Sequence, residues 1–392
     1  MMDLDFGELI APFSQEEFRA DYRGRRPLHI PAATGSTRAE MMRWEEVLDL
    51  VGVLQKWRDA GLKLIMNRQT IAPEHYVMMR ETAAGRMAQP DVDLVAAMMD
   101  MGASLVLDGV EDIRTDARRM CAKLGQEFGG KAGLNVYASK KGIQAFASHC
   151  DPHEVFVVQC EGEKDWRIYA NRAEAPTTNR MVMDTATVDA VKGEVAHRIT
   201  LRPGDVLYIP RGFYHDATAR SERSLHLTFG VQPLYGIGTL DLIRDLALDD
   251  PAFREFLPSA ADGAEELQET LKDLGQRLAD KFASPGFLED VVVQQRLQNP
   301  LPLKSVKAGG DNRTWRRTQR AARVEQPASG SYVIAGDQQR ELGYLSDVAH
   351  WMVGASVFND RQLFARFSHH PQEEVEPLRA WFAQQGLIEP VG

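Results

Sequence analysis

Residues 204–215 read GDVLYIPRGFYH, a run that places a short apolar segment between two turn sequences. The opening Gly-Asp pair is typical of a turn. Residues 206–209 are all aliphatic or aromatic, which predicts a buried strand. The Pro-Arg-Gly that follows predicts the end of this strand, because proline and glycine are disfavoured inside a sheet. His215 is therefore expected at the boundary of the next strand.

A second short stretch, SHCDP at residues 148–152, supplies a histidine and a carboxylate two positions apart. The apolar run at 155–158 predicts a strand here, and residues i and i+2 of a strand point to the same side. His149 and Asp151 can then meet one ion, while Cys150 points away. With His215 from a neighbouring strand they form the two-histidine, one-carboxylate set of a non-haem Fe(II) oxygenase.

Three protein ligands leave coordination positions open for a co-substrate and O2, whereas a structural zinc site closes with four ligands, usually including thiolates. An isolated His-x-Asp pair is more often a pair of surface polar residues. The spacing from Gly204 to His215 is more specific, because Gly, five residues, Pro, one residue, Gly, two residues, His is similar to cupin-type double-stranded β-helices. The alternative is a cupin barrel that has lost its metal.

From about residue 26 to residue 300 the chain resembles the JmjC-type ribosomal oxygenases, most densely at residues 149–169, HCDPHEVFVVQCEGEKDWRIY. The resemblance implies a mixed α and β fold built on a double-stranded β-helix (cupin/JmjC jelly roll) with flanking helices. It also implies a dioxygenase that uses Fe(II), 2-oxoglutarate as co-substrate and O2 to hydroxylate a protein side chain. The target would be an arginine or histidine of a ribosomal protein. No catalytic residue beyond the metal ligands is expected.

Lys164, fifteen residues after the first metal histidine, is the position at which the resembling family holds the distal carboxylate of 2-oxoglutarate. Residues 161–163, Glu-Gly-Glu, predict a hairpin turn, after which Lys164, Trp166 and Ile168 alternate onto one face of a strand. A lysine on an apolar face points inward, where an unpaired ammonium is costly. It therefore needs an anion, either the co-substrate or a nearby carboxylate in a structural salt bridge.

Three further pocket residues are implied by the same resemblance: Asn135 and Tyr137, which share one face of a strand over residues 133–138, and Thr228. Asn135 and Tyr137 can equally be a satisfied polar pair lining a barrel interior. Asp216, directly after His215, is a candidate for orienting a metal ligand, although its direction is open. Three remaining histidines of this region are interpreted as core or surface residues rather than ligands: His153, His197 and His226.

The pattern divides the chain into a catalytic domain at 1–238, a helical dimerisation region at 239–300 and a winged-helix-like module at 301–392. Residues 1–130 read as mainly helical, with helices over 39–60, 92–101 and 112–128 and a short strand over 26–31. Residues 131–235 are strand-rich and form the barrel. The last part predicts helices at 345–353, 360–367 and 374–385, with strands near 330–336 and 386–388.

Five apolar residues follow helical spacing between positions 267 and 282: Leu267, Leu271, Leu274, Leu278 and Phe282. They are either the buried side of a helix packed on its own domain or a homodimer interface, which the resembling oxygenases have in this region. A basic stretch follows at 304–323. It is either a solvated face or a surface for an acidic or RNA-containing partner.

Composition restricts the class of protein. With 44% hydrophobic and 26% charged residues, the chain reads as an ordinary globular protein, and neither a membrane span nor a signal peptide is expected. Three cysteines indicate a reducing, cytoplasmic setting, and a net charge of −10 disfavours direct nucleic-acid binding. Two rival functions remain: a hydroxylase that tailors a precursor peptide, and a non-catalytic cupin-fold scaffold or binding protein.

Overall fold

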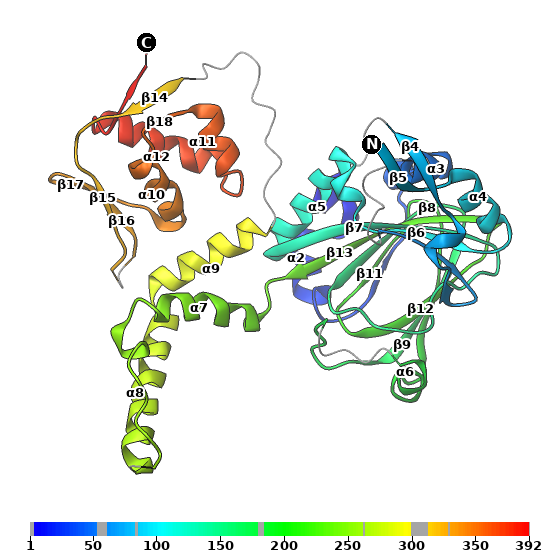
Figure 1. Cartoon of the computed structure of the whole chain (residues 1–392). Coiled ribbons are helices and arrows are strands. Elements are labelled where there is room, and N and C mark those ends of the chain that lie inside the picture. Colours follow the sequence, from blue (N-terminus) through cyan, green and yellow to red (C-terminus); the bar gives the residue numbers. More distant parts are fainter. Residues whose placement is uncertain are drawn as a thin grey trace. The chain divides into compact units, whose positions relative to one another are not determined.

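A computed structural model of the chain describes residues 4–52, 61–82, 85–178, 184–261, 263–298, 313–327 and 330–391. It has two compact units, Met1–Pro233 and Leu234–Gly392 (Figure 1). None of its described helices is both long enough and apolar enough to cross a bilayer. The three-part division at 238 and 300 stays a prediction.

The first unit is built on an eight-stranded antiparallel sheet, the major sheet. In spatial order its strands are β1 (Leu28–Ile30), β11 (Val206–Ile209), β8 (Glu154–Glu161), β13 (Arg223–Pro233), β7 (Gly130–Lys140), β6 (Ser104–Leu107), β2 (Leu62–Met66) and β3 (Gln69–Thr70). All four residues of β11 are buried, as the sequence predicted.

A three-stranded antiparallel sheet, the minor sheet, faces the major one: β10 (Val195–Leu201), β9 (Lys164–Arg172) and β12 (Phe213–Ala219). Apolar residues of both sheets form a common core, among them Val155 and Val157 of β8 and Ile168 of β9. From β8 to β13 the chain passes repeatedly between the two sheets, as in a double-stranded β-helix. The expected hairpin at 161–163 is wrong, because β8 and β9 lie in different sheets and the turn crosses between them.

The outer face of the major sheet is covered by aromatic residues of the N-terminal helices. Phe6 of α1 (Phe6–Ile10) and Phe128 of α5 (Thr115–Phe128) pack edge-on against each other and against Phe156 of β8. Phe156 and Val158 thus face the helices, while Val155 and Val157 face the minor sheet. A strand buried on both faces reads as a continuous apolar run, which is why the sequence identified this one.

The N-terminal region holds more strand than predicted. Besides β2, β3 and β6, it contains the hairpin β4 (Val77–Thr82) and β5 (Gly85–Pro90). The helix predicted over 92–101 is confirmed as α4 (Val92–Asp100). The one predicted over 39–60 is a 3-10 turn, η2 (Arg38–Met41), followed by α3 (Trp44–Val51), and its last eight positions lie outside the described residues.

In the second unit, the helical character expected of residues 239–300 is confirmed for the described residues by α7 (Thr239–Ala247), α8 (Ala264–Phe282) and α9 (Pro285–Leu297). The three C-terminal helices are confirmed as α10 (Ser346–Gly354), α11 (Asp360–Arg366) and α12 (Gln372–Gln384). Two three-stranded sheets accompany them, β18-β14-β19 and β15-β16-β17. Their strands are β14 (Thr314–Arg317), β15 (Arg323–Glu325), β16 (Tyr332–Ala335), β17 (Gln338–Glu341), β18 (Val357–Asn359) and β19 (Ile388–Pro390). The winged-helix assignment stays a prediction.

Several arginines of the basic stretch have partners within the second unit. Arg316 pairs with Glu389, and Arg317 donates to the carbonyl of Leu387 at 2.7 Å. Lys304 and Lys307 lie outside the described residues. These contacts favour the interpretation of a structural and solvated face for the described part of the stretch, and binding of an acidic partner there stays a prediction.

Candidate metal centre and co-substrate pocket

The two metal-site histidines lie directly opposite each other in an isolated antiparallel bridge. The amide of His149 donates to the carbonyl of His215 at 3.0 Å, and the amide of His215 donates back at 2.8 Å. His149 precedes β8, which begins only at Glu154, so the predicted strand starts later than the metal pair. The extended segment still alternates as expected, because Cys150 is buried with Tyr169 and Tyr214 in a separate apolar cluster.

Hydrogen bonds to backbone carbonyls set the tautomer of both imidazoles. Nδ1 of His149 lies 2.9 Å from the carbonyl oxygen of Ala147, and Nδ1 of His215 lies 3.0 Å from that of Phe213. A carbonyl oxygen only accepts, so each Nδ1 carries the proton and each Nε2 keeps its lone pair for a metal. Fixing a ligand histidine through its other ring nitrogen is the usual arrangement in metal sites.

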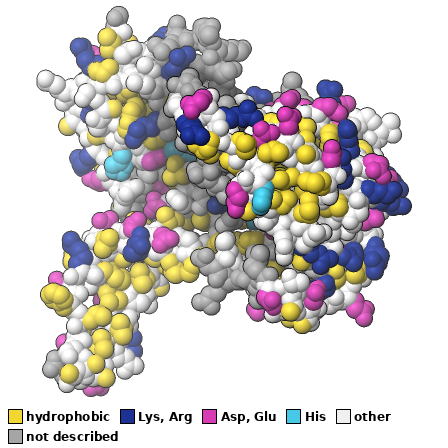
Figure 2. Space-filling model, turned by 45° about the vertical axis from the view of Figure 1, so that its right-hand side comes forward, with side chains coloured by type: hydrophobic (Ala, Val, Ile, Leu, Met, Phe, Trp, Pro, Cys, Tyr) yellow, Lys and Arg dark blue, Asp and Glu magenta, His cyan; other side chains and the backbone are white. Residues whose placement is uncertain are grey.

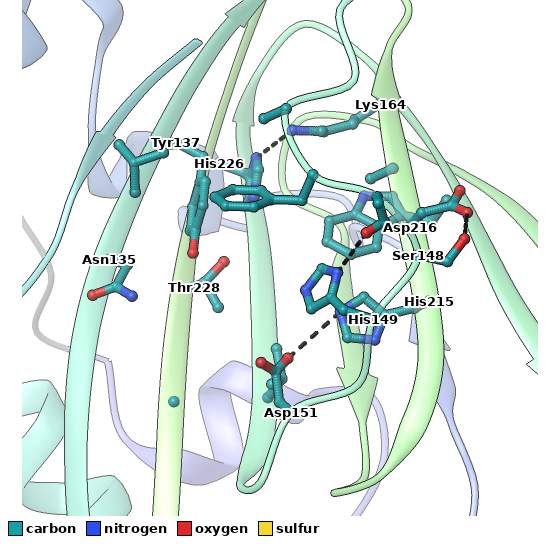
Figure 3. Close-up of a pocket in the computed structure, with 18 of the residues that line it drawn as sticks. Asn135, Tyr137, Ser148, His149, Asp151, Lys164, His215, Asp216, His226 and Thr228 are labelled. Atoms are coloured by element: carbon teal, nitrogen blue, oxygen red, sulfur yellow. Dashed lines mark hydrogen bonds and ion pairs between the residues drawn. The ribbon is translucent and has the colours of Figure 1, made fainter. Parts of the chain in front are cut away.

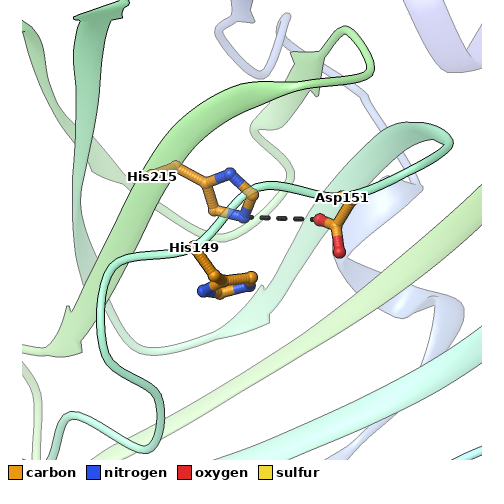
Figure 4. Close-up of side chains that lie close together, drawn as sticks. All are labelled: His149, Asp151 and His215. Carbon is orange, nitrogen blue, oxygen red and sulfur yellow. Dashed lines mark ion pairs between the residues drawn. The ribbon is translucent and has the colours of Figure 1, made fainter. Parts of the chain in front are cut away.

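Asp151 completes the predicted set, with its Oδ2 3.5 Å from Nε2 of His215. The ligand atoms of His149, Asp151 and His215 all lie within 4.8 Å of one another (Figure 4). Burial and the neighbouring His149 lower the pKa of His215 to about 4, so its ring is neutral at pH 7. Burial acts to raise the pKa of Asp151, but the neighbouring histidines outweigh it and the pKa lies below its ordinary value. Two neutral imidazoles and one carboxylate fit Fe(II).

Asp216 points to the other side of β12 and ties the two ligand-bearing segments together. Its carboxylate accepts 2.7 Å hydrogen bonds from Ser148, Arg167 and Tyr169. The bond with Ser148 is drawn in Figure 3. Ser148 directly precedes His149, and Asp216 directly follows His215. Burial opposes ionisation of Asp216, but these hydrogen bonds outweigh it, and its pKa is lower than usual. The direction that the sequence left open is therefore away from the metal site, toward the segment that carries His149.

Lys164 is the first residue of β9 and is only 5% exposed. The alternation of Lys164, Trp166 and Ile168 onto the buried face of this strand is confirmed. Among the described residues no carboxylate forms an ion pair with Lys164, so the structural salt bridge considered from the sequence is not present there. Its hydrogen-bond partner is Nδ1 of His226, at 3.5 Å. Burial lowers the pKa of Lys164 to about 7.

The three weaker candidates line the same cavity as Lys164 and the metal ligands. Asn135 stands opposite Thr228 in the β7–β13 register, and Tyr137 stands opposite His226. Asn135 accepts from the amide of Gly109 at 3.2 Å. In Figure 3 the Tyr137 hydroxyl lies on the Thr228 side, away from Lys164. A role of these residues in co-substrate binding stays a prediction.

The cavity has a volume of about 560 Å³. Two residues that line it were not singled out as site residues by sequence reasoning. His226 was interpreted as a core or surface histidine, and Trp166 only as part of an apolar face. His226 is indeed buried and is not one of the metal-site residues, but it contacts Lys164. His226 and Thr228 are two positions apart on the same strand, so their side chains share one face. This spacing was the signal in the sequence that could have identified His226 as a pocket residue.

The chain is similar to a known domain family and to several known proteins. Residues 110–236 match the family model of the JmjC domain. Human ribosomal oxygenase 1 is 38% identical over 170 residues, which cover 41% of this chain and 26% of that protein. The Drosophila persimilis protein named bifunctional lysine-specific demethylase and histidyl-hydroxylase NO66 is 29% identical over 222 residues, covering 56% of this chain and 30% of that one.

Among solved structures, the Escherichia coli ribosomal oxygenase YcfD in complex with cobalt and 2-oxoglutarate aligns over 97% of this chain and 99% of its own. The TM-score is 0.50 and the sequence identity is 15%, which shows a shared fold. The curated relatives are much longer than the part of them that matches, since this chain spans less than a third of each of the two named here.

Proposed function

We propose, from the premise that residues 110–236 of this chain form a JmjC domain, that the protein is an Fe(II)- and 2-oxoglutarate-dependent dioxygenase. The resemblance to ribosomal oxygenases predicted from the sequence is confirmed by its relatives. One observation carries the proposal: the His149, Asp151 and His215 cluster shares a cavity with Lys164, a buried cation that has no described carboxylate partner.

Each residue then has a defined role. His149, Asp151 and His215 would hold Fe(II), and Lys164 would bind the far carboxylate of 2-oxoglutarate. Iron with 2-oxoglutarate and O2 supplies the oxidation of a substrate C–H bond, with release of succinate and CO2. The chain itself orients the co-substrate between two fixed points. It also limits water, because Trp166 and His226 close the buried side of the cavity.

A binding experiment tests the proposal directly. Calorimetry should show that 2-oxoglutarate binds the Mn(II)-loaded protein and does not bind the metal-free protein. His215→Ala should abolish binding through loss of the metal, and Lys164→Ala should abolish or strongly weaken it with the metal still bound. Absence of 2-oxoglutarate binding in the wild-type protein would reject the oxygenase and favour the scaffold function.

For the substrate, we propose an arginine or histidine side chain of a ribosomal protein. The names of the relatives support this, because they include ribosomal oxygenase 1 and a histidyl-hydroxylase. Purified unmodified ribosomal proteins should gain one oxygen atom when incubated with the iron-loaded enzyme, as read by peptide mass spectrometry. No gain on any arginine or histidine would exclude this substrate class.

We propose further that the protein is a homodimer through α8. The five residues of its apolar face share partial or full exposure, and no residue of this helix is buried (Figure 2). Leu271 is 52% exposed and Phe282 is 41% exposed. Light scattering should show a dimer that Leu271→Glu combined with Leu278→Glu converts to a monomer, whereas Gln268→Glu outside this face leaves it intact.

The cysteines support a cytoplasmic location, which we also propose. Cys121, Cys150 and Cys160 are all buried free thiols, as expected where disulfides do not form and iron stays ferrous. Cells can be lysed under denaturing conditions in the presence of a thiol-labelling reagent. All three cysteines of the protein should then be labelled, which shows that they were reduced in the cell.

A further inference from the structure

The contact between Lys164 and His226 joins the two sheets across the cavity. Lys164 lies on β9 of the minor sheet and His226 lies on β13 of the major sheet. Their Nζ and Nδ1 atoms are 3.5 Å apart (Figure 3). Both side chains are buried, at 5% and 2% exposure. A contact between two basic groups at this depth is not explained by packing alone.

The chemistry of the two side chains decides which of them donates the hydrogen bond. An ammonium has donors only, so Nδ1 of His226 must accept and the ring must be neutral, with its proton on Nε2. Burial and the adjacent Lys164 both hold the pKa of His226 well below its ordinary value, in agreement with a neutral ring. His226 therefore acts as a hydrogen-bond acceptor for the lysine.

The ring of His226 is fixed on two sides. Tyr137 stacks on it with ring centroids 4.8 Å apart and planes 3° from parallel. Trp166 meets it edge-on at 5.7 Å. Since the acceptor atom is held in place, the ammonium that donates to it is also held, and its two other N–H groups remain for a ligand.

Among the residues that the structure describes, none provides an anion that pairs with those N–H groups. The acidic residues at the cavity have other roles: Asp108 pairs with Lys63 at 2.6 Å, Asp151 belongs to the candidate metal site, and Asp216 pairs with Arg167. In addition, the buried Nε1–H of Trp166 has no partner in the described part of the chain. Unused donors at this end of the cavity indicate a ligand with acceptor oxygens.

We propose that His226 is a positioning residue, which holds the Lys164 ammonium so that it meets the far carboxylate of the co-substrate. This inference rests on the proposed function and adds to it a residue that acts through Lys164. Lys164 needs this help because its side chain has four rotatable bonds, and an unanchored ammonium would lose more conformational entropy on binding. The prediction is specific to ligands that carry a far carboxylate.

The experiment compares two ligands on Mn(II)-loaded protein by calorimetry. 2-Oxoglutarate has the far carboxylate, whereas pyruvate has the same 2-oxo acid group without it. His226→Phe keeps an aromatic ring against Tyr137 and removes the acceptor. It should weaken 2-oxoglutarate binding about tenfold, as expected for loss of a hydrogen bond to a charged group, and leave pyruvate binding unchanged.

Two further variants separate positioning from a structural effect. His226→Gln, whose side-chain oxygen can accept from Lys164, should retain most of the 2-oxoglutarate affinity. In the Lys164→Ala background, His226→Phe should have no additional effect, because His226 acts through the lysine. His197→Phe, on the exposed part of β10, is the matched control and should bind both ligands as the wild type does.

The outcomes are distinguishable. Wild-type protein that fails to bind 2-oxoglutarate overturns the proposed function, and this inference with it. Wild-type protein that binds while His226→Phe binds equally well overturns the positioning role alone. Equal losses for 2-oxoglutarate and pyruvate, or additive losses in the double variant, also overturn it, because both indicate a general disturbance of the site.

Discussion

At the scale of single residues, Asp216 illustrates how the proposed metal site is supported by a residue outside the ligand set. His215 and Asp216 are neighbours on β12, so their side chains point to opposite sides of the strand. One side presents the metal ligand, and the other accepts from Ser148, Arg167 and Tyr169. Because Ser148 adjoins His149, this network restrains both ligand histidines.

We expect Asp216→Asn to lower metal affinity by about tenfold to a hundredfold, the usual effect of losing such a partner. The asparagine amide cannot accept from all three donors and places an N–H opposite one of them. Titration with Mn(II) measures the change. Asp165→Asn, at an exposed position on β9, is the control and should leave the affinity unchanged. An unaltered affinity in Asp216→Asn would contradict the supporting role.

Lys164 predicts a pH dependence of co-substrate binding. Burial lowers its pKa to about 7, and a bound dicarboxylate would raise this pKa by favouring the charged form. Below pH 7 the free lysine is already protonated, so affinity should be constant. Above pH 7 binding must take up a proton, so affinity should fall by up to about tenfold per pH unit.

Calorimetry of 2-oxoglutarate binding at pH 6 and at pH 8.5, in buffers of different ionisation enthalpy, measures both the affinity and the proton uptake. Lys164→Arg is the informative comparison, because arginine stays charged over this range and should remove the proton uptake between these pH values. Equal proton uptake in the wild type and in Lys164→Arg would show that another group is responsible.

At the scale of elements, the connection from β8 to β9 shows how a glycine permits two segments of the chain to come close together. Gly162 has a φ of +63°, and a Cβ at this position would lie 1.8 Å from the carbonyl oxygen of Arg223. Gly162 lies in the turn that leads from the major sheet to the minor sheet just before Lys164. A side chain at position 162 is disfavoured by the left-handed backbone and also by the nearby carbonyl group of Arg223.

Gly162→Ala should therefore destabilise the protein by clearly more than the roughly 1–2 kcal/mol that a left-handed alanine costs alone. Gly142→Ala is a matched control, since Gly142 also has a positive φ, +77°, but a Cβ added there would meet no described atom within 4 Å. Urea unfolding of both variants measures the difference. Equal losses would mean that the backbone conformation, and not the contact with Arg223, dominates.

At the scale of the whole molecule, the two units have separate apolar cores. The first centres on the helices and the major sheet, and the second on residues such as Val348, Leu378 and Phe382. All three residues of the metal site belong to the first unit. Metal binding at this site should therefore stabilise the core of the first unit.

Calorimetric unfolding should show two transitions. At about one hundred times the dissociation constant, Mn(II) should raise the transition of the first unit by roughly 5–10 °C, the equivalent of about 2.7 kcal/mol. His215→Ala should remove this shift. A single transition that moves as a whole would show that the two units unfold together.

Sequence reasoning succeeded where the signal is local. Residues 155–158 and 206–209 are buried on both faces and read as apolar runs, so their strands were identified. It failed at residues 161–163, because a turn between two sheets has the same composition as a hairpin turn. It also missed β2 and β6, whose pairing with distant strands decides their conformation.

From spacing and strand periodicity, the sequence by itself predicted the candidate ligands His149, Asp151 and His215 and determined the alternation that buries Lys164. The role of Lys164, fifteen positions after His149, came from the family resemblance and stays a prediction. Only the tertiary structure decided that Asp216 faces Ser148, that no described carboxylate neutralises Lys164, and that His226 meets it from the opposite sheet. Such contacts join residues up to 68 positions apart, and local periodicity carries no information about which distant strands come together.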